Sequence, residues 1–206
     1  MNKINVRLKT VKILELLCCV LPAVFWGLIL FGFEEKSLAI TTLLCALIHE
    51  LGHFVCIILT GGTDFSLRSV INGLRIKPRG VRSYDEEILI YLSGPFANIF
   101  AFALCIIMSI TIDKAFMTAA VINLATALSN LMPIRGYDGY GAIRAMIKKQ
   151  ELPERALIAL SCFSSALIFA FCIFSLYLID RYGGGYWIFA VFFVSMIKEL
   201  KESLGE

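Results

Sequence analysis

The sequence predicts an all-α membrane protein that crosses the bilayer about six times. Hydrophobic residues make up 59% of its 206 residues, charged residues only 17%, and the mean hydropathy is +0.82. Soluble domains are nearer to about half apolar and about a quarter charged. This composition excludes a disordered chain, a coiled coil and an ordinary soluble domain. A net charge of +3 on mostly apolar residues also gives no basic surface for nucleic acid.

The apolar stretches have the length of membrane spans, since a helix needs about 20 residues to cross a bilayer. Beside five long stretches there is a sixth, residues 186–197, which is short, so whether it crosses the bilayer fully stays open. The first stretch follows several basic residues, as in a signal peptide. It is longer than a signal peptide's apolar region, and no small-x-small cleavage site follows it, so we expect a retained helix. The five long spans are expected at residues 11–33, 38–60, 88–112, 115–133 and 156–179.

The basic residues are distributed unevenly among the links between these spans. Most of the 19 lie in the N-terminal tail, after the second and fourth spans, and in the C-terminal tail. The alternate links hold only Lys36, Lys114 and Arg181. Because cytoplasmic loops carry the excess of Lys and Arg, we expect a multi-pass protein of the cell membrane with both termini in the cytoplasm. The whole chain, 1–206, is expected to be one membrane-embedded domain.

The longest polar link, residues 61–85, has the pattern of a β-hairpin. Two short, partly alternating runs, 65–71 and 74–77, flank Asn72-Gly73. Asn-Gly between such runs is the strongest short hairpin signal. We therefore expect a small β-hairpin between the second and third helices, and a basic loop lying on anionic lipid is the alternative.

The two histidines of the chain bracket a glutamate in the sequence His49-Glu50-Leu-Gly-His53. Positions four apart share one face of a helix, so both imidazoles can hold one ion and Glu50 can act as a general base. The motif lies in the middle of an apolar span, where an ionisable residue costs about 2.5–3.5 kcal/mol and is usually functional. A single Zn²⁺ is the expected partner, and a polar patch that only packs helices is the alternative.

A zinc ion held by two histidines and a water lacks one protein ligand. None of the seven cysteines lies in a convincing motif, so a carboxylate is expected. Asp138 is the best candidate, because it follows the fourth span in a stretch broken by Pro133 and several glycines. Irregular backbone at membrane depth is tolerated only inside protein or beside a wet cavity. The alternative, that Asp138 is a solvated turn residue, stays open.

Three motifs in this order resemble those of the site-2 protease family of intramembrane zinc metalloproteases. They cover about residues 38–147, which correspond to the family's three-helix catalytic core. No PDZ-like insertion and no CBS-type domain is visible, so the regulatory input is expected to be either missing or supplied by a separate protein. The small six-span form is most similar to the bacterial branch that matures sporulation sigma factors. The motifs are His49-Glu-x-x-His53, Gly94-Pro-Phe-Ala-Asn98 and Asn130-x-x-Pro133-x-x-x-x-Asp138-Gly139.

The resemblance implies a zinc metalloendopeptidase that cleaves peptide bonds in or near transmembrane segments, as in regulated intramembrane proteolysis. Its partners would be the lipid bilayer and a membrane-protein substrate with an unwound or extended segment, guided by the hairpin. Glu50 would be the general base, and Asn98 and Asn130 would support the substrate or the oxyanion. The implied zinc ligands are His49, His53 and Asp138.

Two other functions are considered beside proteolysis. A catalytically inactive scaffold of the same fold is disfavoured, because the three ligands and Glu50 are all present. A metal transporter would need several ligand sites along a path, and the chain offers one histidine pair. Asn123, Thr126 and Ser129 in the fourth span could line a cavity, although small polar residues more often mediate helix packing.

Overall fold

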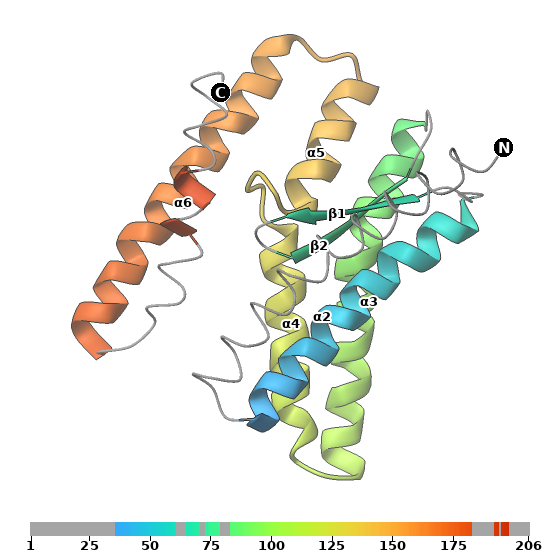
Figure 1. Ribbon diagram of the computed structural model, residues 1–206, viewed down its shortest axis with the longest axis vertical. Helices are drawn as coiled ribbons and strands as arrows, with labels where there is room; N and C mark the ends of the chain where they lie inside the picture. The colour runs from blue at the N-terminus through green and yellow to red at the C-terminus, as the bar shows by residue number, and fades with distance from the viewer. Residues whose placement is uncertain are drawn as a thin grey trace, which may run out of the picture. The chain divides into compact units, whose positions relative to one another are not determined.

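The computed structural model describes residues 36–60, 65–70, 73–78, 83–182, 192–193 and 195–197 (Figure 1). The expected first span, 11–33, lies outside these residues, as does most of the sixth, 186–197. The chain divides into two compact units, Met1–Asn130 and Leu131–Glu206. The elements are α2 (Lys36–Leu59), β1 (Phe65–Val70), β2 (Gly73–Pro78), α3 (Tyr84–Thr111), α4 (Phe116–Leu131), α5 (Asp138–Lys149) and α6 (Glu154–Tyr182).

Three of these helices, α2, α3 and α6, are long and apolar enough to cross a membrane. Their bounds lie within about four residues of the expected spans. Large apolar side chains such as Leu44, Phe100 and Phe169 are more than half exposed on them, as expected for surfaces that face lipid. The helix α4 is apolar but only 16 residues long. The chain is thus a membrane protein, and the count of six spans stays a prediction.

Close packing of α2 against α3 organises the first unit (Figure 1). At the crossing, a Cβ atom added to Gly52 would lie 2.6 Å from the Ser93 carbonyl oxygen and 2.8 Å from the Ala97 Cβ. In a bilayer the hydrophobic effect does not drive helices together, and small residues instead let their backbones pack closely in this way. Gly52 lies between the two histidines of α2 in the sequence, so the close approach brings both against α3.

The helix α3 begins at a capped N-terminus. The Ser83 hydroxyl accepts a hydrogen bond from the Glu86 N–H at 3.3 Å, which satisfies one of the first-turn donors. Pro95 lies inside this helix and carries no N–H for the usual helical bond. It follows Gly94, so the α3 backbone departs from the regular bonding pattern directly beside α2.

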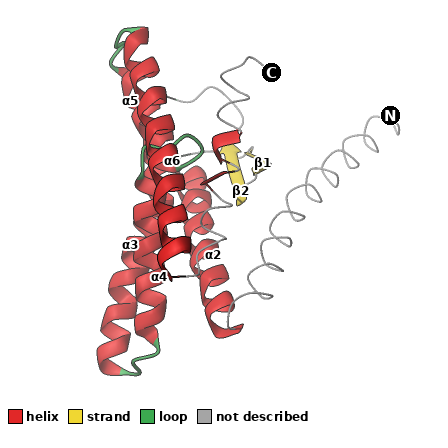
Figure 2. Cartoon of the chain, turned by 90° about the vertical axis from the view of Figure 1, so that its left-hand side faces the viewer, coloured by secondary structure: helices red, strands yellow, loops and turns green. Residues whose placement is uncertain are grey.

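The two strands form an antiparallel hairpin between α2 and α3 (Figure 2, yellow). Phe65 pairs with Pro78 and Val70 pairs with Gly73, and β2 contacts α2. The connection is therefore residues 71–72, one position earlier than the expected Asn72-Gly73, because Gly73 already takes part in strand pairing. The hairpin lies where the sequence predicted it, and its turn comes one residue earlier than expected.

The second unit begins with an irregular segment that leads into α5 and then α6. Gly136 has a φ of +103°, which an L side chain rarely adopts, and a turn there precedes α5. Ile134 is fully buried and packs with Ile168 and Cys172 of α6. The Arg135 N–H donates to the Ser164 hydroxyl at 2.7 Å. These contacts hold the segment that precedes Asp138 against α6.

Candidate metal centre

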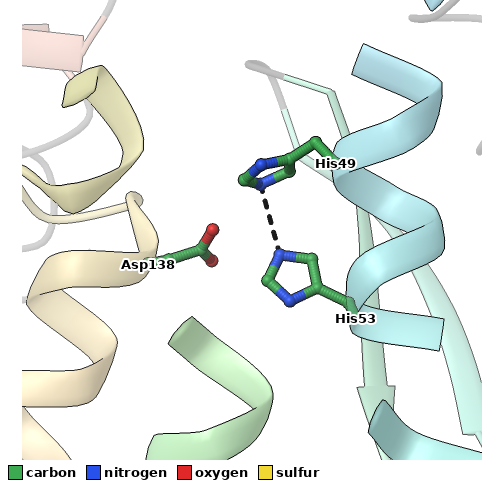
Figure 3. A group of neighbouring side chains, drawn as sticks. All are labelled: His49, His53 and Asp138. Atoms are coloured by element: carbon green, nitrogen blue, oxygen red, sulfur yellow. Dashed lines mark hydrogen bonds between the residues drawn. The ribbon is translucent and has the colours of Figure 1, made fainter. Parts of the chain in front are cut away.

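The α2 helix places His49 and His53 one turn apart on its buried face. The two side chains are 6% and 7% exposed, whereas Leu51 between them is 49% exposed. The ring centroids are 4.8 Å apart, and the two Nε2 atoms lie 3.2 Å from each other (Figure 3). The spacing of four residues therefore aims both imidazoles at one point.

Asn98 of α3 determines how His49 is oriented. Its Nδ2 donates to the Cys45 carbonyl oxygen at 3.0 Å, and this carbonyl can only accept. The Asn98 Oδ1 therefore faces the His49 Nδ1, 2.8 Å away. An oxygen acceptor requires a donor, so the proton of the neutral His49 ring lies on Nδ1.

His53 is oriented by the backbone of α3, the helix that also carries Asn98. Its Nδ1 lies 2.6 Å from the Ile90 carbonyl oxygen, which can only accept. The Ser93 hydroxyl donates to that same carbonyl at 2.7 Å and lies 3.4 Å from the His53 Nδ1. The neutral His53 ring therefore also carries its proton on Nδ1.

The two Nε2 atoms consequently present lone pairs to each other. In neutral rings these lone pairs repel at 3.2 Å, and a shared proton or a metal ion between them removes the repulsion. Two nitrogen ligands at about 2.0–2.1 Å from a tetrahedral zinc ion lie about 3.3 Å apart. Metal-binding histidines typically donate their other N–H to a carbonyl or carboxylate oxygen. The geometry of the pair thus fits two zinc ligands.

Gly94 makes room for the two rings. A Cβ atom at this position would collide with the His53 Nε2, and it would lie 2.8 Å from the His49 Cε1. Any larger residue would have to displace the imidazoles. Gly94 is therefore required at this position for a steric reason that the sequence did not reveal.

Asp138 is the first residue of α5 and is 7% exposed. This burial disagrees with the alternative that it is a solvated turn residue. An anion is favourable at a helix N-terminus, where backbone N–H groups are unpaired within the helix. The next residue, Gly139, must lack a side chain, because a Cβ there would collide with the Leu131 carbonyl.

The ligand atoms of His49, His53 and Asp138 all lie within 4.8 Å of one another, and all three residues are buried (Figure 3). This group could hold a metal ion. Two imidazole nitrogens and one carboxylate oxygen form a donor set of the kind that catalytic zinc sites use, with a fourth position left for water or substrate.

The remaining predicted site residues differ in their surroundings. Glu50 is half-buried, and its Oε2 atom is shielded from solvent. Asn98 is fully buried, and its amide group bonds to the His49 ring through its oxygen and to the Cys45 carbonyl through its nitrogen. The Asn130 Nδ2 donates to the Thr126 carbonyl of its own helix at 2.9 Å. These bonds favour a positioning role for Asn98 over contact with substrate.

A polar cluster holds the segment before Asp138. The Arg135 guanidinium donates to the Ser161 hydroxyl at 2.8 Å and lies 5.8 Å from the centroid of the Tyr140 ring. The Tyr140 hydroxyl lies 3.1 Å from the same Ser161 oxygen. Burial raises the pKa of the Tyr137 phenol, so this residue stays neutral beside Asp138.

No family model matches the sequence, and no curated protein matches it either. Among solved structures, the chain is similar to the site-2 protease from Methanocaldococcus jannaschii, with a TM-score of 0.64 and 18% sequence identity. The similarity covers 91% of this chain and 88% of that protein. The chain therefore has a site-2 protease fold.

Proposed function

We propose that the chain is an intramembrane zinc metalloprotease of the site-2 protease family. It would hydrolyse peptide bonds in or near transmembrane segments of membrane-associated proteins. The observation that carries this proposal is the pair of imidazole Nε2 atoms 3.2 Å apart, each ring fixed by an oxygen acceptor at Nδ1. The site-2 protease fold supports the same conclusion.

One zinc ion would be held by the two histidines of α2 and by Asp138. When bound, such an ion polarises a carbonyl group and lowers the pKa of a water molecule to near 7. Asp138 would supply a negative charge that the two neutral imidazoles lack.

Glu50 would move the proton during hydrolysis. It adjoins His49 in the sequence, and its shielded Oε2 atom lies in a low-dielectric environment. The carboxylate would take a proton from the water as the oxygen adds to the scissile carbonyl carbon. It would then pass that proton to the amide nitrogen as the C–N bond breaks.

The hairpin would bind the substrate as an extended strand. A helical segment hides its peptide bonds in its own hydrogen bonds, so it must unwind before hydrolysis. The sheet formed by β1 and β2 has two strands in the described part of the chain, which leaves each strand with one edge for a further strand. Strand addition would replace the lost backbone bonds. β2 contacts α2, the helix that carries the histidines.

The proposal includes a location and a lineage. The distribution of basic residues supports cytoplasmic termini and a site reached from the cytoplasmic side. We include kinship with the bacterial branch that processes sporulation sigma factors, on the motifs named above, and a regulator that is a separate membrane partner.

Replacement of Glu50 tests the proposal. Cells that express the wild-type chain are compared with cells that express Glu50→Gln, and fragments of membrane proteins are identified by mass spectrometry. We expect fragments that depend on Glu50 while zinc stays bound to the purified variant. Glu154→Gln, the same chemical change at an exposed position at the start of α6, should retain the fragments.

The two alternatives give other results. Identical fragments with Glu50→Gln would contradict the protease and leave a scaffold of this fold. Zinc transport into liposomes that contain the purified chain, unchanged by Glu50→Gln, would favour a transporter.

A further inference from the structure

Asn123 of α4 is a polar residue in the interior of an apolar helix, and it is 1% exposed. Its position does not belong to the motifs that suggested the metal site. A buried amide in a membrane helix is costly unless its hydrogen bonds are made. The bonds that Asn123 makes therefore explain why it lies there.

The side chain joins two helices. Its Nδ2 donates to the Ala119 carbonyl of its own helix at 2.9 Å, and its Oδ1 accepts from the Asn98 Nδ2 of α3 at 2.8 Å. Asn98 in turn meets the His49 Nδ1 of α2. A continuous set of hydrogen bonds thus runs from α4 through α3 to the imidazole on α2.

Each bond in this set has only one workable direction. The Ala119 carbonyl can only accept, so the Asn123 Nδ2 faces it and the Asn123 Oδ1 faces Asn98. The Asn98 amide is then held with its nitrogen toward Asn123 and its oxygen toward His49. An amide held in the opposite sense would favour a proton on the His49 Nε2, which would prevent metal binding.

We infer that Asn123 is a positioning residue for the metal centre. Through Asn98, it holds His49 in the tautomer whose Nε2 lone pair is free to bind the ion. The effect of Asn123 on zinc binding rests on the proposed function, in which His49 is a zinc ligand. The tautomer itself can be measured without metal.

Zinc affinity provides the first readout, measured on the purified full-length chain in micelles by competition with a chelating dye. Loss of an outer-shell partner typically lowers metal affinity about 10–100-fold. The Cys45 carbonyl still holds Asn98 when Asn123 is changed, so Asn123→Leu should lower zinc affinity about tenfold, the low end of that range. Asn123→Asp keeps an oxygen acceptor toward Asn98 but loses the donor toward the Ala119 carbonyl, so it should restore only part of the affinity.

The histidine tautomer provides the second readout. The chain has two histidines, so nitrogen NMR of histidine-labelled, metal-free protein gives few signals. In the wild type we expect His49 with its proton on Nδ1. In Asn123→Leu we expect a fraction with the proton on Nε2, whereas His53, bound to a backbone carbonyl, should not change.

A double mutant separates positioning from simple helix packing. If Asn123 acts only through Asn98, Asn98→Ala with Asn123→Leu should lower zinc affinity no further than Asn98→Ala alone. The control is Thr126→Val, on the same helix, whose hydroxyl donates to the Ile122 carbonyl of that helix at 2.8 Å. It should leave both readouts as in the wild type.

Three results would overturn the inference. They are an unchanged His49 tautomer in Asn123→Leu, additive losses of zinc affinity in the double mutant, and a loss in Thr126→Val equal to that in Asn123→Leu. A wild-type chain that binds no zinc would instead contradict the proposed function. The tautomer measurement on metal-free protein would still decide the role of Asn123.

Discussion

Gly94 of α3 lies against the imidazole of His53 so closely that the ring occupies the space of a Cβ atom. The contact joins the Gly94-Pro95 motif to the histidine motif on α2. It gives the glycine a role in the metal centre, because the rings can keep their positions only while this residue has no side chain.

Gly94→Ala should therefore displace the histidine rings. We expect zinc affinity to fall by at least about tenfold, comparable to loss of an outer-shell partner, with loss of any proteolytic activity. The measurement is dye competition on the purified chain. Phe96→Leu, on the same helix with its ring 59% exposed, is the control. Wild-type affinity in Gly94→Ala would show that the rings can shift without cost.

Gly52→Ala should weaken the packing of α2 on α3. Alanine gains about 0.8–1 kcal/mol of helix propensity over glycine, but the added Cβ would lie 2.6 Å from a backbone oxygen of Ser93. Backbone cannot move aside as a flexible side chain can, and overpacking costs about 1–3 kcal/mol. We expect a lower thermal midpoint in micelles than for the wild type.

The matched control for this change lies next to it on the helix. Leu51→Ala removes a side chain that is 49% exposed and should lower the midpoint less. A midpoint for Gly52→Ala above that of the wild type would mean that helix propensity outweighs the crowding.

Asp138→Asn should remove the charged ligand while keeping the shape of the side chain. We expect zinc affinity to fall by more than the about 10–100-fold typical of an outer-shell partner, measured as zinc retained after dialysis against a chelator. Asp113→Asn changes an exposed aspartate in the link between α3 and α4 and should retain the metal. Equal zinc retention in Asp138→Asn and the wild type would exclude Asp138 as a ligand.

Ser164→Ala tests how the segment before Asp138 is held. Ser164 is fully buried, and its hydroxyl accepts from the Arg135 N–H. Removal of an acceptor from a buried N–H costs about 1–3 kcal/mol. We expect a lower thermal midpoint than for Ser165→Ala, an exposed neighbour on α6. Equal midpoints for the two variants would contradict this anchoring.

The elements that the sequence predicted well are those with a local signal. The helices α2, α3 and α6 follow from long apolar runs, and the paired strands follow from the alternation around Asn72-Gly73. The position of the turn was wrong by one residue, because turn geometry and strand pairing, rather than the dipeptide alone, decide where pairing begins.

The histidine pair was predicted because spacing along one helix is readable in a sequence. The hydrogen bonds that Asn98 and Asn123 make were not, because they depend on which faces of α2, α3 and α4 meet. The steric role of Gly94 was hidden for the same reason: a glycine in a helix does not reveal what occupies the place of its side chain.

The proposed protease requires one zinc ion bound to two imidazoles and a carboxylate. The most direct test is the X-ray absorption spectrum of the zinc-loaded, full-length chain. We expect a four-coordinate ion with nitrogen and oxygen ligands at about 2.0–2.2 Å, and with the scattering pattern of two imidazoles. A sulfur ligand at about 2.3 Å, or a spectrum unchanged when His49 and His53 are replaced by alanine, would contradict it.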